Sequence, residues 1–296
     1  MLNKIAFIGG DLRMPEAARF TREKCASLSV YGFDSYEYCY ECFGITEEKS
    51  LEMAVSGAEA IVFGLPSSYD GINIYAPYSS HEISISSVIS AAFPSTFIFG
   101  GKISKEIIEA ADRKNITCYD YFQREELTIK NALITAEGAL QTAMSETPFT
   151  IHNSRCLVIG YGRIGKLLAK MLKNLGAKVT CSARKPSDLA LIECADINSI
   201  ETSDIIRNIS EYNIIFNTVP FRLLTEEILS FVHSDTLIID LASKPGGLDF
   251  ECARRLGLKV IWATALPGKV APETSGKIIS DTVFNMIREL DREVTV

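Results

Sequence analysis

Short apolar runs alternate with longer amphipathic segments along the whole chain. In the first half we predict strands at Lys4–Ile8, Leu28–Tyr31, Ala60–Phe63, Thr96–Phe99 and Ile116–Tyr119. Between them, apolar residues recur near a 3.6-residue period, which predicts helices over Pro15–Ala26, Glu47–Val55 and Lys105–Lys114. Strands that alternate with helices in this way are typical of parallel βαβ units.

The second half starts the same alternation again at the apolar run that ends in Gly160. A helix over Lys166–Leu175 ends at Gly176, a residue suited to a left-handed C-cap. Further strands are predicted at Lys178–Cys181, Ile214–Asn217, Leu237–Leu241 and Lys259–Trp262, and an amphipathic helix at Glu273–Leu290.

A chain of 296 residues is longer than one hydrophobic core usually organises. We therefore predict an α/β protein with two Rossmann-like, doubly wound parallel-sheet domains joined by a long helix. The expected boundaries are 1–125 for a flavodoxin-like N-terminal domain, 126–150 for the connecting helix, 151–272 for a dinucleotide-binding domain and 273–296 for a C-terminal helix that can return to the first domain.

Residues 64 to 81 are rich in Gly, Pro, Ser, Tyr and Asn and contain no periodic pattern. They follow the carboxyl end of the predicted strand Ala60–Phe63, and ligands bind at such ends in open α/β sheets. This segment is therefore predicted to be a long functional loop.

The formal net charge is −7, with no long run of one sign, so a nucleic-acid backbone would be repelled. No apolar stretch approaches the roughly 20 residues that span a bilayer. The first residues read as a strand and turn, not as an export signal. We expect a cytoplasmic protein with neither a nucleic-acid nor a membrane partner.

The eight cysteines are scattered and lack the dense spacing of a secreted disulfide scaffold, so we expect free thiols. Cys39 and Cys42 form a CxxC pair, but one pair without a second pair or a nearby histidine does not complete a zinc site. We interpret it as two semi-buried thiols beside a strand and expect no metal.

The strongest motif is Gly160-Tyr161-Gly162-Arg163-Ile164-Gly165, which lies between an apolar strand and a helix. In such a fingerprint the first glycine makes a tight turn, the second lets the backbone approach a pyrophosphate, and the third allows close helix-to-strand contact. Free N–H groups at the helix amino end attract the phosphates. We predict that these six residues bind a dinucleotide.

The next strand ends in Ser182-Ala183-Arg184-Lys185, where an NAD site usually has an acidic residue. A hydroxyl followed by two cations suits a 2′-phosphate. We therefore predict NADP(H) as the cofactor, held by Ser182, Arg184 and Lys185. The alternative, that the two cations are solvated turn residues, stays open.

Two further segments follow buried strands and are predicted to line the nicotinamide half of the site. They are Asn217-Thr218-Val219-Pro220 and Asp240-Leu241-Ala242-Ser243-Lys244-Pro245-Gly246-Gly247. Within the second segment, Lys244 is either a ligand for a substrate carboxylate or an ordinary surface lysine. The three histidines, His81, His152 and His233, are equally open to a surface role.

The chain resembles the family of dipicolinate synthase A subunits. The resemblance lies in Ile8–Arg13, Ala136–Gly138, Phe149–His152, Gly160–Gly165, Ser182–Arg184, Leu241–Gly247 and Leu266–Pro272. It implies NADP-dependent oxidation of dihydrodipicolinate to dipicolinate, pyridine-2,6-dicarboxylate, together with a partner, the flavoprotein-like B subunit of dipicolinate synthase. It also implies the mother-cell cytoplasm of a sporulating bacterium, and we expect a homo-oligomer.

Such an oxidation forms an aromatic ring, so it needs little beyond orientation beside the nicotinamide and a proton acceptor. A small dicarboxylate substrate calls for cations at two points. The candidates are Arg13, Arg163, Arg222 and Lys244, although the family often has arginine at position 244. Glu137, supported by His152, is the candidate for a further polar role near the cleft. Our predicted catalytic set is Lys244, Glu137 and Arg13.

Two other functions stay open. A 2-hydroxyacid dehydrogenase also pairs two Rossmann-like domains, but its chemistry needs a histidine acid/base, expected after the last strand. This chain has Leu266-Pro267-Gly268 there. The second alternative is a non-catalytic NADP-binding protein that stabilises or senses a partner.

Overall fold

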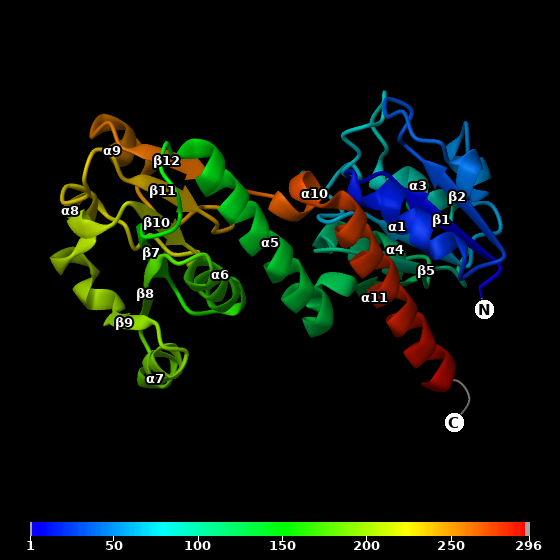
Figure 1. Ribbon diagram of the computed structural model, residues 1–296. Helices are drawn as coiled ribbons and strands as arrows, with labels where there is room; N and C mark the ends of the chain where they lie inside the picture. Colours follow the sequence, from blue (N-terminus) through cyan, green and yellow to red (C-terminus); the bar gives the residue numbers. More distant parts are fainter. Residues whose placement is uncertain (1, 294–296) are drawn as a thin grey trace. The chain divides into compact units, whose positions relative to one another are not determined.

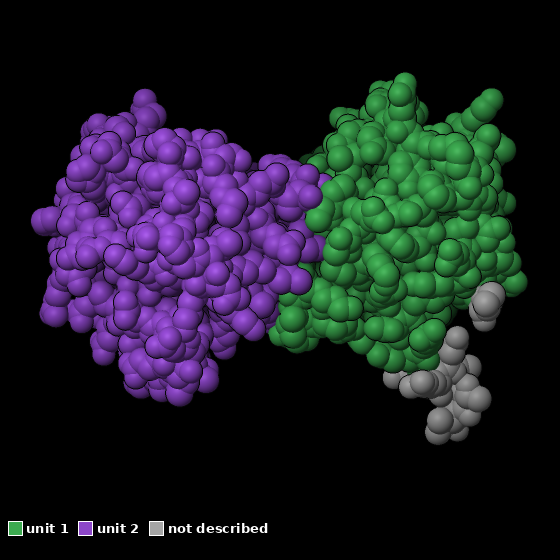
Figure 2. All heavy atoms as spheres, viewed as in Figure 1, with its two compact units in different colours: residues 1–131, 271–296 green, residues 132–270 purple. Residues whose placement is uncertain are grey.

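The computed structural model describes residues 2–293 and contains two parallel β-sheets with flanking helices (Figure 1). The chain divides into two compact units, coloured separately in Figure 2. Unit 1 runs to Asn131 and resumes at Ala271, and unit 2 is Ala132–Val270. The division falls within helix α5, Glu125–Glu146. The prediction of two Rossmann-like α/β domains is confirmed, while the residue boundaries stay predictions.

Unit 1 is built on a six-stranded parallel sheet in the order β3-β2-β1-β4-β5-β6. Its strands are β1 Lys4–Ile8, β2 Ser27–Tyr31, β3 Thr46–Glu47, β4 Ala60–Phe63, β5 Phe97–Gly100 and β6 Thr117–Asp120. Strand β4 is apolar and buried at all four positions, as expected where helices cover both faces of a parallel sheet. The order places β1 and β4 side by side at the centre of the sheet.

The helices of unit 1 begin where serine side chains cap them. Ser50, Ser84 and Ser104 each accept a hydrogen bond from a backbone N–H in the first turn. The α-helices are α1 Arg13–Arg22, α2 Leu51–Val55, α3 Ile85–Ala91, α4 Lys105–Asp112 and α11 Pro272–Glu293, and the 3₁₀ helices are η1 Glu41–Phe43 and η2 Tyr121–Gln123.

Helix α11 packs directly on α1, although the two helices lie at opposite ends of the chain. A Cβ atom on Gly276 would lie 2.6 Å from the backbone of Ala17 and of Arg13, so only glycine allows this approach. Nearby, the hydroxyl of Thr21 donates to that of Ser280 at 2.9 Å. The closing helix is thus an integral part of unit 1.

Unit 2 repeats the architecture with the strand order β12-β11-β10-β7-β8-β9. Its strands are β7 Arg155–Ile159, β8 Lys178–Ala183, β9 Asn198–Glu201, β10 Ile214–Asn217, β11 Leu237–Asp240 and β12 Lys259–Trp262. Its α-helices are α6 Arg163–Asn174, α7 Pro186–Cys194, α8 Glu226–Leu229, α9 Phe250–Arg255 and α10 Leu266–Val270, and its 3₁₀ helices are η3 Thr202–Arg207 and η4 Ile209–Glu211.

Sequence patterns missed the two edge strands β3 and β9. Both are short and carry polar residues, so neither shows the apolar run of a buried strand. Glu47 begins a predicted helix, but it pairs with Val30 in β3, and the helix begins only after the cap at Ser50.

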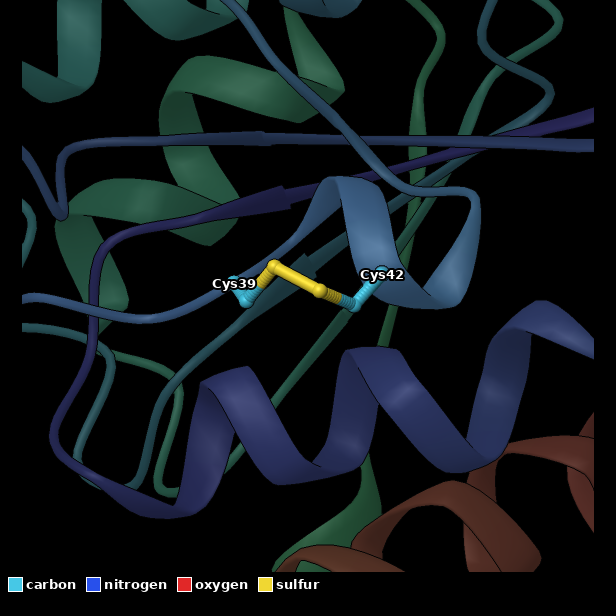
Figure 3. The surroundings of a disulfide bond; sticks show 2 residues. All are labelled: Cys39 and Cys42. Atoms are coloured by element: carbon cyan, nitrogen blue, oxygen red, sulfur yellow. A yellow bond between two sulfur atoms is a disulfide. The ribbon is translucent and has the colours of Figure 1, made fainter.

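The prediction that all cysteines are free is wrong, because Cys39 and Cys42 form a disulfide (Figure 3). Helix η1 turns the chain and brings their Cα atoms to 5.4 Å, within the range that a disulfide bridges. Both residues are also exposed, not semi-buried. The other cysteines, at positions 25, 118, 156, 181, 194 and 252, are free thiols.

Candidate functional site

The glycine fingerprint forms the turn from β7 into α6, as its spacing predicts. Gly160 has φ +93°, and a Cβ atom there would lie 2.7 Å from the side chains of Thr218 and Val219. A Cβ on Gly165 would lie 2.1 Å from the carbonyl oxygen of Gly160. These two glycines are therefore required by close packing within the protein itself.

Gly162 differs from the other two glycines of the motif, because no atom lies within 4 Å of a Cβ placed on it. It is the N-cap residue of α6, so the free N–H groups of the first helical turn adjoin this open space. Such an arrangement suits an anionic group held against the backbone. The residues of the turn thus fit the pyrophosphate of a dinucleotide.

A hollow of about 450 Å³ lies beside this turn, at the carboxyl ends of β7, β8 and β10. It is lined by Gly160–Gly162, Ala183–Lys185, Asp188, Thr202, Thr218–Phe221 and Leu223. Outside the fingerprint, the predicted cofactor residues in this lining are Arg184, Lys185 and the segment Thr218-Val219-Pro220. The sequence did not identify Asp188 and Thr202, which reach the hollow from the following elements.

Arg184 and Lys185 are both exposed at the end of β8 and line the hollow. Within residues 2–293 neither forms an ion pair, so both charges face solvent. The opposing carboxylate on this lining is that of Asp188 alone. The local charge therefore favours an anionic ligand group at this end of the cavity.

Several predicted cofactor residues lie elsewhere in the neighbourhood. Ser182 is fully buried, its hydroxyl has no hydrogen-bond partner within residues 2–293, and its backbone carbonyl accepts from Gly160 N at 3.1 Å. Ile164 packs on the core of unit 2, and Arg163 begins α6. Leu241 and Ala242 are buried, whereas Ser243 is exposed. Contacts of these residues with a cofactor stay predictions.

Asn217 and Asp240, which belong to the two segments predicted to line the nicotinamide half of the site, connect the loops at this edge of the sheet. The amide of Asn217, at the end of β10, donates to Asp240 Oδ1 at 2.7 Å and to the carbonyl of Val219 at 3.0 Å. Both Asn217 and Asp240 are completely buried. Each is a polar residue that ends an otherwise apolar strand; the sequence placed both in segments predicted to line the site but gave neither an individual role.

The Asp240 carboxylate is held by N–H donors. Besides the Asn217 amide, Ala242 N donates to Oδ1 at 3.1 Å, and Gly247 N donates to Oδ2 at 2.8 Å. A Cβ on Gly247 would lie 1.8 Å from Asn217 Nδ2, which explains the glycine at that position. The carboxylate therefore fixes the loop that carries Lys244.

Lys244 is exposed on this loop, and its peptide bond to Pro245 is cis. Within the described residues its ammonium group forms no hydrogen bond or ion pair. Arg222, another candidate cation, is already paired with Asp249. Lys244 is therefore the better placed of the two to bind a further anion.

Arg13 lies in unit 1 and is already fully engaged. Its guanidinium bonds to Asp11 at 2.7 and 2.8 Å and to the carbonyl of Leu65. Burial alone would lower the pKa of Arg13, but the Asp11 carboxylate outweighs it and the pKa is raised. This arginine is 5% exposed and joins the start of α1 to the loop after β4.

The structure does not bring Glu137 and His152 together. Glu137 is exposed on α5, and the next residue, Gly138, packs near Leu266 beyond the carboxyl end of β12. His152 precedes the amino end of β7 and packs against Gly176. No contact within residues 2–293 supports their predicted joint role.

The other histidines also lie apart from the fingerprint. His233 precedes β11 and so lies at the amino edge of the second sheet. His81 belongs to unit 1, where its Nε2 is 2.6 Å from the hydroxyl of Tyr31. Neither lines the hollow beside Gly162.

Comparisons with known proteins agree with this architecture. The family model for the N-terminal domain of dipicolinate synthase A subunits matches residues 4–122. The model described as "D-isomer specific 2-hydroxyacid dehydrogenase, NAD binding domain" matches residues 134–238. The dipicolinate synthase A subunit of Bacillus subtilis (strain 168) is 31% identical over 292 residues, which are 98% of this chain and 97% of the relative.

Solved structures show the same likeness. The dipicolinate synthase A subunit from Bacillus halodurans is 29% identical with a TM-score of 0.86, covering 96% of this chain and 97% of that one. The Bacillus subtilis structure is also 29% identical, with a TM-score of 0.85 and coverages of 98% and 97%. A transhydrogenase from Sinorhizobium meliloti shares the fold. It is 16% identical with a TM-score of 0.71, covering 95% of this chain and 92% of that chain.

None of the described helices is both long and apolar enough to cross a membrane.

Proposed function

Because the chain belongs to the family of dipicolinate synthase A subunits, we propose that it catalyses the NADP-dependent oxidation of dihydrodipicolinate to dipicolinate. The observation that carries this proposal is the hollow beside Gly162, whose lining includes the open backbone of the turn and the cations Arg184 and Lys185, which form no ion pair within residues 2–293. The matched NAD-binding domain supports a nicotinamide dinucleotide, and these cations support the phosphorylated form.

In this proposal the turn Gly160–Gly165 holds the pyrophosphate, and Arg184 and Lys185 hold the 2′-phosphate. Thr218, Val219 and Pro220 line the hollow beyond the turn and adjoin the nicotinamide end. The bound nicotinamide supplies a hydride acceptor. The chain's own residues orient the substrate and exclude water.

The substrate loses a hydride and a proton and becomes aromatic, so binding and orientation matter most. We assign one of its two carboxylates to Lys244, which is exposed, cationic and held on a loop that Asp240 fixes. Arg13 is given a positioning role, because its donors already bind Asp11 and Leu65. Glu137 stays a weaker catalytic candidate.

A flavoprotein-like B subunit completes the enzyme in this proposal, because the relatives are named as A subunits of a synthase. We also propose that the chain is a homo-oligomer and acts in the mother-cell cytoplasm of a sporulating bacterium. Co-purification of the A and B subunits and sedimentation of the purified chain test the assembly.

The decisive experiment mixes the purified chain, with and without the B subunit, with NADP or NAD and freshly made dihydrodipicolinate. NADPH formation is followed by absorbance and dipicolinate by its ultraviolet spectrum. We expect turnover with NADP. Dinucleotide binding without turnover in any mixture would favour the non-catalytic alternative.

Cofactor preference is tested with Arg184→Asp. A carboxylate at this position repels a 2′-phosphate, so the ratio of NADP to NAD affinity should fall roughly a hundredfold, since an attraction is lost and a repulsion gained. Asp235→Asn, an exposed charge change at the opposite edge of the sheet, is the control. An unchanged ratio of NADP to NAD affinity would mean that Arg184 does not contact the 2′-phosphate.

A 2-hydroxyacid dehydrogenase activity is the second candidate, because one domain matches that family's NAD-binding model. Against it, His152 and His233 both lie at the amino edge of the second sheet, and the segment after β12 forms α10 without histidine. Turnover of 2-keto acids in the same assay would support this second candidate function.

A further inference from the structure

The Cys39–Cys42 disulfide lies on an exposed turn outside the dinucleotide site. Both cysteines are exposed, and η1 carries Cys42 (Figure 3). The remaining six cysteines are unpaired, so the protein is not a disulfide-stabilised scaffold. An exposed disulfide is accessible to thiol–disulfide exchange.

The turn holds its shape through other interactions. Phe43 N and Ile45 N both donate to the carbonyl of Tyr40, at 3.0 and 3.1 Å. The ring of Tyr40 is buried, and Arg22 on α1 donates to the carbonyl of Gly44 at 2.7 Å. Because the two cysteines are only three positions apart, the disulfide removes less entropy from the unfolded chain than a bridge across a long loop would.

The two sulfurs have different surroundings. Cys42 lines a hollow of about 280 Å³ together with Arg19 and Arg22, and Cys39 does not. Arg19 is paired with Glu16 and Glu273, but the acceptors of Arg22 among the described residues are two backbone carbonyls, those of Gly44 and Cys25. Glu23 also lines this hollow, yet forms no ion pair with Arg22 in the described structure. A cation without a carboxylate partner beside a cysteine stabilises its thiolate.

We propose that Cys39–Cys42 is a reversible redox site that exchanges with a dithiol protein, with Cys39 as the sulfur attacked and Cys42 as the leaving thiolate. The dithiol's thiolate bonds to Cys39 Sγ, the Cys39–Cys42 bond breaks, and Cys42 leaves as a thiolate beside Arg22. The second thiol of the dithiol then loses its proton and attacks the mixed disulfide, which releases Cys39. Two electrons and the proton of the second thiol pass to the cysteine pair, which ends as the Cys39 thiol and the Cys42 thiolate, and the dithiol becomes a disulfide.

Access is tested on the full chain under native conditions. Free thiols are first blocked with N-ethylmaleimide, the protein is treated with dithiothreitol, and newly exposed thiols are labelled with heavy N-ethylmaleimide and located by peptide mass spectrometry. We expect heavy label on Cys39 and Cys42 alone, with no change in the circular dichroism spectrum. If heavy label appears only after denaturant is added, the site is structural and the proposal fails.

The direction of exchange is tested with Cys39→Ser and Cys42→Ser, each of which leaves one thiol of the pair. At pH 7 we expect Cys42 to react with iodoacetamide roughly tenfold faster than Cys39, which corresponds to about one pKa unit. Equal rates, or a faster Cys39, would overturn the assigned direction.

The role of Arg22 is tested in the Cys39→Ser background. Arg22→Gln should reduce the Cys42 rate to that of Cys39, and Arg22→Lys should keep it, because the charge is retained. Arg254→Gln, an exposed arginine in unit 2, should change nothing and serves as the matched control. A Cys42 rate that Arg22→Gln leaves unaltered would contradict the proposal, provided that the thermal midpoint of the variant is unchanged.

Discussion

At the scale of single residues, the buried carboxylate of Asp240 is the group that holds the loops of the candidate site together. It accepts hydrogen bonds from Asn217, Ala242 and Gly247 and forms no ion pair in the described residues. These bonds tie the end of β10 to the loop after β11. The glycine at position 247 follows from the same packing, since a side chain there would displace Asn217.

Asp240→Asn tests this arrangement. One carboxylate oxygen is replaced by an NH₂ group that faces an N–H donor, and an unsatisfied buried donor costs about 1–3 kcal/mol. We expect a loss of about 2 kcal/mol in urea unfolding, within that range, and weaker substrate binding through Lys244. Asp235→Asn, an exposed residue of the same unit, is the control, and equal stability of the two variants would contradict the assigned role.

The fingerprint glycines permit a second residue-level test. Gly162→Val places its side chain in open space, so the fold should persist while dinucleotide binding falls at least about a hundredfold, because the pyrophosphate can no longer approach. Gly165→Val should instead destabilise unit 2, since its Cβ meets the Gly160 carbonyl. Calorimetric titration and circular dichroism separate the two effects. If the Gly162→Val protein binds the dinucleotide normally, the pyrophosphate does not bind at this turn.

At the scale of elements, the contact of α1 with α11 holds the last helix to the first sheet. Gly276 allows the helices to approach closely, and polar pairs flank the crossing: Thr21 with Ser280, and Lys24 with Asp281. Sequence periodicity predicted both helices but not their pairing, because the residues that meet lie at opposite ends of the chain.

Gly276→Leu should separate the two helices. The atoms that the new side chain meets belong to the backbone of α1, so they cannot move aside, and overpacking of this kind costs about 1–3 kcal/mol or more. Thr274→Leu, at an exposed position of the same helix, should have little effect. Urea unfolding followed by far-ultraviolet circular dichroism compares the two, and similar midpoints would count against the packing argument.

The same helix pair predicts a dependence on pH. Partial burial alone would raise the pKa of Asp281, but hydrogen bonds from Lys24 and Lys277 outweigh it and lower the pKa. A lowered folded-state pKa stabilises the protein above the ordinary aspartate pKa of about 3.9, and this contribution disappears as pH falls through the folded value. The free energy of unfolding of the wild type should exceed that of Asp281→Asn by roughly 0.5 kcal/mol at pH 7. This difference should disappear as the pH falls toward 3. A gap that is constant from pH 7 to pH 3 would contradict the ion pairs.

At the scale of the whole molecule, two units with the same topology have different chemistry at the carboxyl ends of their sheets. In unit 1 the turn after β1 contains the paired Asp11 and Arg13, whereas in unit 2 the turn after β7 is open at Gly162. A dinucleotide is therefore expected to bind unit 2 alone.

Binding should stabilise the complete chain by mass action. At NADP concentrations of about a hundred times Kd the expected gain is about 2.7 kcal/mol. Thermal denaturation with increasing NADP should show a rising midpoint for wild type and a flat response for Gly162→Val. A flat response for both proteins would mean that the hollow beside Gly162 binds no dinucleotide.

The sequence by itself determined the α/β class, nearly all of the central strands and the fingerprint turn, because apolar period and glycine spacing are local properties. Only the tertiary structure decided which polar groups are free. It showed that Arg13 and Arg222 already have carboxylate partners while, in the part of the chain described, Arg184 and Lys244 have none. It also showed that Glu137 and His152 lie apart and that Cys39 and Cys42 are joined. Most of these outcomes depend on contacts between distant segments, on which the local pattern of a chain carries no information.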